Sequence, residues 1–357
     1  MGKKTDMMLC DKIMSALPMI AQLDRPRITP GSNIPDNMIL DIEDSGVYLG
    51  LETIMGKGYY VGKPAGRDGN ILTLGVNGSG KSSILVKSTL ETWRDIFVAI
   101  DIKGELSKHY QRLLQNCLVQ RPCIVFNPSN VGSHYDVYAL LKKGGPNFVQ
   151  YVREIAYAII PKPLDVREPY WIDMARDLLS GAIVYYYELG LDFIGSILMV
   201  QDTPVADLCK EIMQEGSNLA RMFVSEIAGL KRQQQSAIGT EVKRHTMIFA
   251  TDPDIQSALA PSESDEEHFD TFSWESIVPD AEAPNVFLCI NQDRLEQWGG
   301  VLRLMITQLI RQLERRPEKY SSQGCDTKPL LLLLDEFPLL GKMDVIQNAM
   351  TTLRSKN

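Results

Sequence analysis

Short apolar runs alternate with amphipathic stretches in two parts of the chain. The runs are Ile71–Leu74, Phe97–Ile100 and Cys123–Phe126 in the first part, and Val286–Ile290 and Leu330–Leu334 in the second. Each run is short and apolar along its whole length, which is typical of a strand that is buried on both faces. The stretches between the runs have the periodicity of helices. This alternation predicts an α/β fold with a parallel sheet.

The alternation stops between about residues 145 and 245, where the pattern is helical throughout. Pro169 and Gly190 bracket one clear helix with an apolar stripe, because proline favours the start of a helix and glycine its end. Thr203 and Pro204 suit the N-cap and first position of another helix, and a third should include Gln233–Thr246. The pattern therefore predicts an all-α block inserted into the α/β domain.

We expect four parts in the chain. They are an N-terminal peripheral segment (1–69), the first part of the α/β domain (70–145), the all-α insertion domain (146–245) and the second part of the α/β domain (246–357). With 357 residues, of which 44% are hydrophobic and 23% charged, the chain has enough apolar sequence for a sizeable core.

Charge and cysteine content exclude several classes of protein. The net charge of −8 argues against a generally basic nucleic-acid coat protein, although it leaves room for a local basic surface. The six cysteines include no CxxC pair, so we expect reduced thiols of a cytosolic protein and neither a disulfide framework nor a zinc site. We find no uncharged apolar stretch long enough for a transmembrane helix.

The stretch GVNGSGKS, from Gly75 to Ser82, fits the phosphate-loop pattern G-x-x-x-x-G-K-[ST]. It stands between a predicted strand and a predicted helix, as this motif requires. Backbone N–H groups of such a loop surround phosphate oxygens, its lysine (Lys81) reaches the β- and γ-phosphates, and its hydroxyl (Ser82) is a ligand for Mg²⁺. The predicted nucleotide-binding residues are Gly75, Asn77, Gly78, Ser79, Gly80, Lys81, Ser82 and Ser83.

Two acids, Asp335 and Glu336, follow the apolar run Leu330–Leu334 directly. Two carboxylates at the end of a buried strand are costly unless positive partners meet them. A phosphate loop upstream supplies such partners, because the second acidic motif of these proteins holds the nucleotide-bound Mg²⁺. We therefore assign Asp335 to the metal, with Ser82, and Glu336 to the attacking water, with Lys81 as the third catalytic residue. The pattern leaves open that the two acids exchange roles.

The kind of nucleotide follows from motifs that the sequence lacks. A signalling GTPase needs N-K-x-D to recognise guanine, and Asn291-Gln292-Asp293 does not fit it. An LSGGQ-type signature of ABC ATPases is also missing from the sequence. The default expectation is therefore an ATPase with ATP and Mg²⁺ as cofactors.

Several motifs together resemble the TraG/TraD-like coupling proteins of conjugative and type IV secretion systems, which are related to the FtsK and HerA DNA translocases. The matching stretches are GVNGSGKS (75–82), AIDIKGEL (99–106), FNPSN (126–130) and LLLLDEFPLLGKM (331–343). The resemblance implies a RecA/FtsK-like P-loop domain with an all-α insertion, which assembles as a homo-hexamer. It also implies an ATPase that drives DNA or a relaxase–DNA substrate to the type IV secretion channel, in the cytoplasm at the inner face of the cell membrane.

The sequence departs from this family in three ways. Ile102 stands where the family usually has proline in Asp-Pro-Lys-Gly-Glu. The family usually carries N-terminal transmembrane helices, so we expect this chain to meet the membrane only indirectly. The family also continues beyond the second acidic motif into further strands with a polar sensor residue. Because the sequence ends at Asn357, we expect an incomplete sheet and weakened hydrolysis.

Two other functions remain open from the sequence. One is an FtsK/HerA-like DNA translocase outside secretion, and the other is a recruitment module that binds nucleotide without turnover. Several weaker signals also stay open between a functional and a structural role. They are Asp101, Lys103 and Glu105 near the nucleotide, Arg354 as an arginine finger, the basic groups Lys231-Arg232 and Lys243-Arg244-His245 on DNA, and Tyr185-Tyr186-Tyr187 in base stacking.

Overall fold

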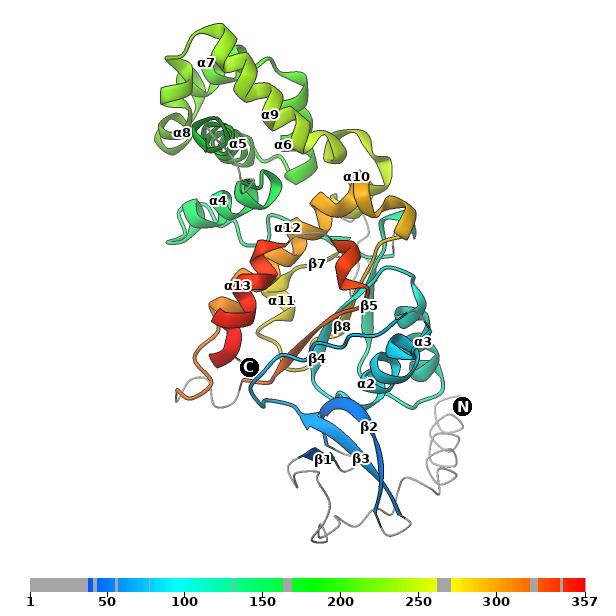
Figure 1. Ribbon diagram of the computed structural model, residues 1–357. Helices are drawn as coiled ribbons and strands as arrows, with labels where there is room; N and C mark the ends of the chain where they lie inside the picture. The colour runs from blue at the N-terminus through cyan, green and yellow to red at the C-terminus, as the bar shows by residue number, and fades with distance from the viewer. Residues whose placement is uncertain are drawn as a thin grey trace, which may run out of the picture.

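The structure is a computed structural model in which a parallel sheet lies below a group of helices (Figure 1). It describes residues 38–40, 44–54, 57–76, 78–130, 132–162, 169–261, 271–321, 327–340 and 343–356. The first 37 residues of the predicted N-terminal segment lie outside these ranges. The α/β fold with a parallel sheet and many helices confirms the predicted fold class.

The central sheet has four parallel strands in the order β5-β8-β4-β9. The strands are β4 (Ile96–Asp101), β5 (Cys123–Phe126), β8 (Asn285–Cys289) and β9 (Leu330–Leu334). The register pairs Ile100 with Leu334, so β4 and β9 end side by side. Each of these strands is an apolar run that the sequence predicted, and all four predictions are confirmed.

Both faces of this sheet are covered by helices, which explains why its strands are apolar throughout. Helices α2 (Lys87–Thr92) and α3 (Glu105–Gln115) lie on one face, and α12 (Leu295–Glu314) and α13 (Asp344–Thr352) lie on the other (Figure 1). Successive residues of β4 point to opposite faces. Phe97 and Ala99 pack with the first pair of helices, whereas Ile96, Val98 and Ile100 pack in the larger core that includes α12.

The prediction of a strand at Ile71–Leu74 is wrong. This segment has no strand pairing, and its side chains are exposed, with Leu72 at 76% and Leu74 at 83%. A strand forms only where a neighbour accepts and donates its backbone hydrogen bonds. Among the described residues, β9 is the edge strand of the sheet and pairs only with β4. The apolar run of residues 71–74 therefore stays extended and unpaired.

Six helices follow one another from α4 to α9 within the described residues. They are α4 (Phe148–Ile159), α5 (Pro169–Glu188), α6 (Phe193–Asp202), α7 (Val205–Glu215), α8 (Asn218–Ala228) and α9 (Arg232–Thr251). The expected helix after Pro169 is confirmed, and α9 contains the third predicted helix. The helix near Thr203 begins one residue later than expected, because Pro204 itself is the N-cap residue of α7.

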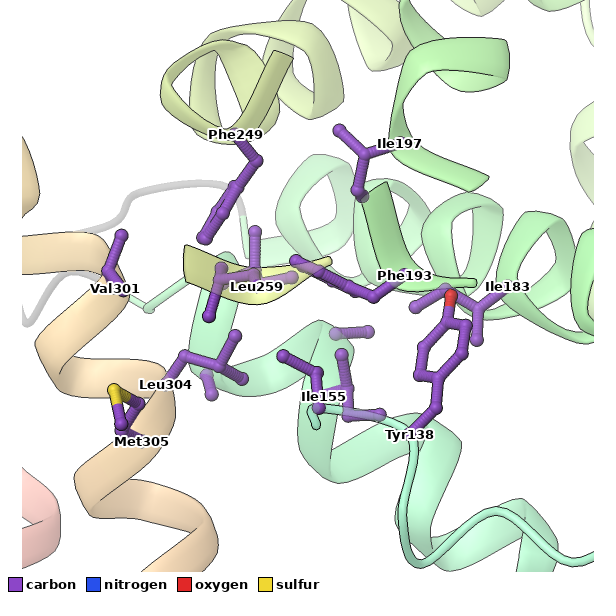
Figure 2. Close-up of a cluster of buried hydrophobic side chains, with 14 of the residues drawn as sticks. Tyr138, Ile155, Ile183, Phe193, Ile197, Phe249, Leu259, Val301, Leu304 and Met305 are labelled. Atoms are coloured by element: carbon purple, nitrogen blue, oxygen red, sulfur yellow. The ribbon is translucent and has the colours of Figure 1, made fainter. Parts of the chain in front are cut away.

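The helical region shares one continuous core with the sheet. Figure 2 shows Ile183 of α5, Phe193 of α6 and Phe249 of α9 in one cluster with Leu304 of α12, the helix that also covers the sheet. Each of these four side chains is less than 3% exposed. Helix α10 (Pro253–Leu259) adds Leu259 to the same cluster. The insertion is therefore packed onto the α/β part by buried apolar contact.

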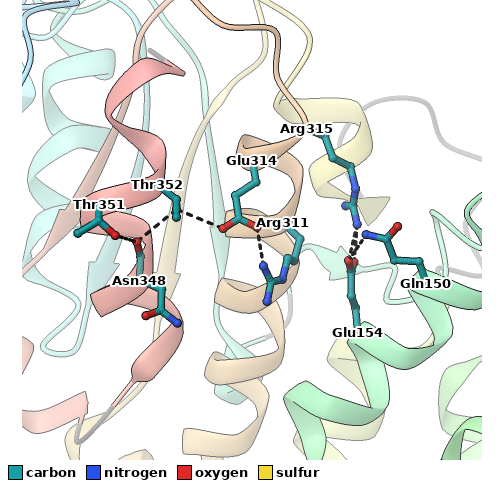
Figure 3. A network of polar contacts seen from close by, with 8 residues as sticks. All are labelled: Gln150, Glu154, Arg311, Glu314, Arg315, Asn348, Thr351 and Thr352. Carbon is teal, nitrogen blue, oxygen red and sulfur yellow. Dashed lines mark hydrogen bonds and ion pairs between the residues drawn. The ribbon is translucent and has the colours of Figure 1, made fainter.

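A polar network joins the same two parts at their surface (Figure 3). Arg315, directly after α12, donates to both carboxylate oxygens of Glu154 on α4, each at 2.6 Å. Glu314 accepts from Arg311 at 2.6 Å and from Thr352 of α13 at 3.2 Å. Three helices, α4, α12 and α13, are thus linked by short contacts in addition to their apolar packing.

Smaller elements complete the described chain. An antiparallel sheet of order β1-β3-β2 precedes the α/β part, and a short parallel pair β6-β7 lies below the helices. Their bounds are β1 (Ile39–Leu40), β2 (Gly46–Ile54), β3 (Lys57–Pro64), β6 (His134–Tyr135), β7 (Thr271–Phe272) and α11 (Trp274–Ile277), with single turns η3 (Pro128–Asn130), η4 (Gln292–Arg294), η5 (Phe337–Leu340) and η6 (Leu353–Ser355).

The cysteine prediction is confirmed only in part. Cys123, Cys209 and Cys289 are free thiols, whereas Cys117 is disulfide-bonded. Cys117 lies in an exposed turn just after α3. The spacing of cysteines along the chain could not indicate this, because a disulfide depends on distance in the folded protein.

Candidate functional site

The candidate site lies where the ends of β4 and β9 meet the phosphate loop. Ser82, in the first turn after the loop, donates a hydrogen bond of 3.0 Å to Oδ1 of Asp335, at the end of β9. These two residues are 253 positions apart in the sequence. The structure therefore brings together the two residues that the sequence assigned to a metal ion, and it does so through one direct contact.

The phosphate loop has a backbone that only glycine adopts easily. Gly78 and Gly80 have φ angles of 79° and 87°, in the left-handed region. The loop is also tight, since a Cβ atom on Gly75 would lie 2.6 Å from Oγ of Ser79. Residues Lys81–Val86 (η2) form a π-helical turn that continues into α2. The first N–H groups of this helix point back toward the loop and are available to an anion.

Lys81 closes the loop on itself. Its ammonium donates hydrogen bonds to the carbonyl oxygens of Gly75, at 2.6 Å, and Val76, at 3.0 Å. These are backbone acceptors within the loop, and a phosphate group would offer the same ammonium stronger, charged acceptors. Ser83 is exposed beside Ser82. Asn77 lies outside the described residues.

Glu336 has an unusual backbone and a lysine partner. Its φ angle is 54°, a left-handed conformation that is uncommon for a residue other than glycine. Its Oε1 atom lies 2.5 Å from Nζ of Lys103, which follows the end of the neighbouring strand β4. The hydrogen bond that Lys103 donates to Glu336, together with the negative charges of Glu336, Asp335 and Glu105, raises the pKa of Lys103. Lys103 therefore stays charged beside the acids.

The turn that carries Lys103 is held by Asp101. The Asp101 side chain is 2% exposed and accepts hydrogen bonds from the backbone N–H of Glu105, at 3.1 Å, and from the N–H and hydroxyl of Ser107, both at 2.8 Å. Gly104, with φ of 63°, forms the N-cap of α3. Asp101 thus orders the start of α3, and it is Lys103 that reaches the acids.

The residues present fit a nucleotide with a magnesium ion. Mg²⁺ prefers oxygen ligands and keeps several waters, so it needs only one or two protein groups besides phosphates. Ser82 and Asp335 provide a hydroxyl and a carboxylate within 3.0 Å of each other, beside the loop. Among the described residues there is no cluster of three or more His, Cys, Asp or Glu side chains that could hold a metal by itself.

Sequence reasoning missed the residues that support the site from behind. Ser107 and Cys289 lie against the buried side of Asp101, with the Cys289 thiol 3.7 Å from its Oδ2. Burial, together with the charge of Asp101, raises the pKa of Cys289 to about 12, so this thiol remains protonated. The hydrogen-bonding role of Ser107 has a weak sequence signal, since Ser107 lies in the first turn of a helix that begins after Gly104. Cys289 has none, because it comes from another strand.

The weaker candidates mostly have partners within the chain. Arg354 pairs with Asp68 at 3.4 Å. Lys243 donates to the carbonyl of Gln201, and Arg244 and His245 both contact Glu241. Tyr185 and Tyr186 of α5 belong to the core, since they are 3% and 1% exposed, and the partly buried Tyr187 packs against it.

No helix in the described ranges combines the length and the apolar character that crossing a lipid bilayer requires.

Comparison with known proteins identifies the family. A model of the family described as Type IV secretory system Conjugative DNA transfer matches residues 36–356. Protein VirD4 of Rhizobium rhizogenes is 26% identical over an alignment of 289 positions, which covers 77% of this chain and 40% of the relative. The conjugal transfer protein TraG of Escherichia coli is 23% identical over an alignment of 342 positions, which covers 84% of this chain and 51% of TraG. The chain thus spans about two fifths to one half of these relatives.

Solved structures of the bacterial conjugative coupling protein TrwB have the same fold. The unbound form matches with a TM-score of 0.59 and 16% identity, over 79% of this chain and 58% of TrwB. TrwB in complex with the ATP analogue ADPNP matches with a TM-score of 0.63, over 95% of this chain and 73% of TrwB. TrwB has also been solved with ADP and Mg²⁺. Since the family model covers most of its length, this chain belongs to the type IV secretory system conjugative DNA transfer family.

Proposed function

We propose that this chain is the nucleotide-binding part of a coupling ATPase in conjugative type IV secretion. The observation that carries the proposal is the 3.0 Å contact between Ser82 and Asp335, which joins the phosphate loop to the acidic end of β9. Membership in a family of conjugative DNA transfer supports the biological setting. The nucleotide would be ATP with Mg²⁺, as the complexes of TrwB with an ATP analogue and with ADP and Mg²⁺ suggest.

Each residue of the site then has a separate task. Lys81 would exchange the carbonyls of Gly75 and Val76 for the β- and γ-phosphates, whose charge it neutralises. Ser82 and Asp335 would hold the metal, and Glu336 would orient the attacking water. The metal supplies further stabilisation of negative charge on the phosphates. The loop glycines and residues Asn77, Ser79 and Ser83 would contribute backbone and hydroxyl contacts.

We further propose that hydrolysis drives transfer of DNA, or of a relaxase bound to DNA, toward the channel of the secretion system. The protein would act as a homo-hexamer in the cytoplasm, at the inner face of the membrane. Residues 146–245 would form the inserted domain between the two parts of the nucleotide-binding domain, at 70–145 and 246–357, and residues 1–69 the peripheral segment.

The experiment is steady-state ATP hydrolysis with Mg²⁺, with and without single-stranded or double-stranded DNA. We expect turnover that rises with DNA and disappears in Lys81→Ala and Glu336→Gln. Lys108→Ala is the matched control, because Lys108 is an exposed lysine of α3 away from the site. Turnover that persists in both site variants would contradict the assignment. Dependence on a relaxase would separate a secretion coupling protein from a DNA translocase outside secretion.

One observation favours a second candidate, a recruitment module that binds nucleotide without turnover. Residues 71–76, which lead into the loop, are exposed and unpaired, so the loop lacks the support of a strand on that side. Binding of ATP without hydrolysis, together with relaxase binding by the protein, would support this candidate over the first.

A further inference from the structure

The acids at the end of β9 contact two different partners. Asp335 accepts from Ser82, which belongs to the phosphate loop. Glu336 binds Lys103, which belongs to the turn after β4. The two carboxylates are adjacent in sequence, yet within the described part of the chain only Asp335 has a hydrogen bond to the loop and its first turn.

The geometry of the turn after β4 limits what can move. The backbone on either side of Lys103 is fixed, because buried Asp101 binds the N–H groups of Glu105 and Ser107 and Gly104 begins α3. The Lys103 side chain is free to change direction, since it is 48% exposed. Glu336 is 32% exposed. An ion pair this accessible to water is weak, so a stronger ligand can separate it.

The phosphates of a bound nucleotide would be such a ligand. A triphosphate at the loop carries several negative charges close to Asp335, and these attract an ammonium group on the neighbouring strand end. The pair between Lys103 and Glu336 then exchanges for one between Lys103 and the nucleotide. Glu336 is left with both carboxylate oxygens available to a water molecule.

We propose that Lys103 is a positioning residue that restrains Glu336 in the nucleotide-free protein and releases it when the γ-phosphate of ATP arrives. This inference rests on the proposed nucleotide site but not on turnover. It assigns to Lys103 a task that couples the state of the nucleotide to the orientation of the residue that activates water.

Zero-length crosslinking tests the contact directly in the unmodified protein. A carbodiimide converts a carboxylate into an O-acylisourea. An adjacent amine attacks its acyl carbon, which forms an amide bond and releases the urea. We expect mass spectrometry to find the amide between Lys103 and Glu336 in nucleotide-free protein and in ADP with Mg²⁺. We expect its yield to fall several-fold in ADPNP with Mg²⁺. The control is the pair Lys142 and Glu275, 2.7 Å apart and remote from the site, whose crosslink should not change.

Three crosslinking results would overturn the inference. They are a Lys103–Glu336 crosslink that persists at saturating ADPNP, its absence in all states while the control forms, and an equal loss with ADP. The first would make the pair a permanent bridge, and the last would remove the dependence on the γ-phosphate. None of these results depends on whether the protein hydrolyses ATP. Failure of the inference is therefore distinct from failure of the proposed function.

A double-mutant cycle in nucleotide affinity gives a second readout. Lys103→Met and Glu336→Gln each remove the same ion pair. Their effects on the ratio of ADPNP affinity to ADP affinity should therefore not be additive in free energy. We expect the double variant to gain about two- to five-fold less than the product of the two single variants, the range open to an exposed ion pair. Lys103→Arg should behave as wild type. In a control cycle with Lys108→Met in place of Lys103→Met, the effects on affinity should be additive with those of Glu336→Gln. Additive effects in the Lys103 cycle would contradict the proposal.

Discussion

Helix α5 and the segment 71–76 are both rich in apolar residues, yet one is buried and the other is exposed. Ala182 and Ile183 of α5 are fully buried among the neighbouring helices. Leu72 and Leu74, on the way into the phosphate loop, are 76% and 83% exposed. Apolar residues are thus buried in the helical region but remain exposed in the segment before the loop.

The difference arises because the two regions satisfy their backbone hydrogen bonds in different ways. A helix bonds its own N–H and C=O groups, so an apolar stripe along it needs only another surface to pack against. An extended segment has no internal bonds and becomes a strand only beside another strand. The helices of residues 148–251 supply one another with surfaces, whereas segment 71–76 has no paired strand among the described residues.

The largest expected effect comes from the junction core of the helical region. Phe249 is fully buried and its ring lies 5.2 Å from that of Phe193. Phe249→Ala should lower the free energy of unfolding by about 3–5 kcal/mol, because it leaves a cavity that the helices cannot fill. Denaturant unfolding would measure it, with Met247→Ala on the exposed side of the same helix as control. A loss below about 1 kcal/mol would mean that the junction is loosely packed.

A residue of the candidate site should affect activity and leave stability unchanged. Lys81→Ala should lower ATP turnover by about 10²–10³-fold, the loss typical when one group that stabilises developing charge is removed. It should leave the unfolding midpoint unchanged, because among the described residues the Lys81 ammonium donates hydrogen bonds only to carbonyl oxygens of its own loop. Parallel turnover and unfolding measurements test both parts. A large loss of stability would show that the loop supports the fold as the helices do.

The polar link between the two parts should have an intermediate effect. Glu154→Gln neutralises the carboxylate whose two oxygens both accept from one guanidinium nitrogen of Arg315; the side chains of Glu154 and Arg315 are 13% and 25% exposed. We expect a loss of about 1–3 kcal/mol in the free energy of unfolding, as for hydrogen bonds between charged groups. Arg311→Met, which breaks a more exposed pair with Glu314, should cost less than about 1 kcal/mol. Equal effects would mean that exposure does not control these contacts.

The smallest effect should come from the loop segment. Leu72→Ser and Leu74→Ser replace side chains that are 76% and 83% exposed, so each should change the free energy of unfolding by no more than about 0.5 kcal/mol. Leu332→Ser, in paired strand β9, provides the contrast and should cost clearly more. If Leu74→Ser cost as much as Leu332→Ser, the segment would be packed in solution and the contrast drawn here would fail.

Much of the fold was predictable because runs of consecutive apolar residues indicate its strands. The runs that became β4, β5, β8 and β9 are apolar throughout, as strands covered on both faces must be. The start of α5 at Pro169 followed from proline chemistry. The run Ile71–Leu74 has the same pattern, and it failed as a prediction because pairing depends on a neighbour that the pattern does not describe.

The site was predictable in its parts but not in its connections. The motif spacing indicated Lys81, Ser82 and Asp335 as members of one site, and the structure joins Ser82 to Asp335. The partner of Glu336 was not predictable, although Lys103 was a candidate near the nucleotide. Lys103 approaches Glu336 because β4 and β9 are neighbours in the sheet, and strand order is not written in either segment.

The sequence by itself determined the residue types of the phosphate loop, the acids after β9 and the periodicity of the helices, since these depend on neighbours a few positions apart. Only the tertiary structure decided the strand order, the unpaired state of segment 71–76 and the pairing of Lys103 with Glu336 across 233 positions. Local chemistry is carried by each segment alone, whereas a contact between distant segments depends on which surfaces the whole chain buries together.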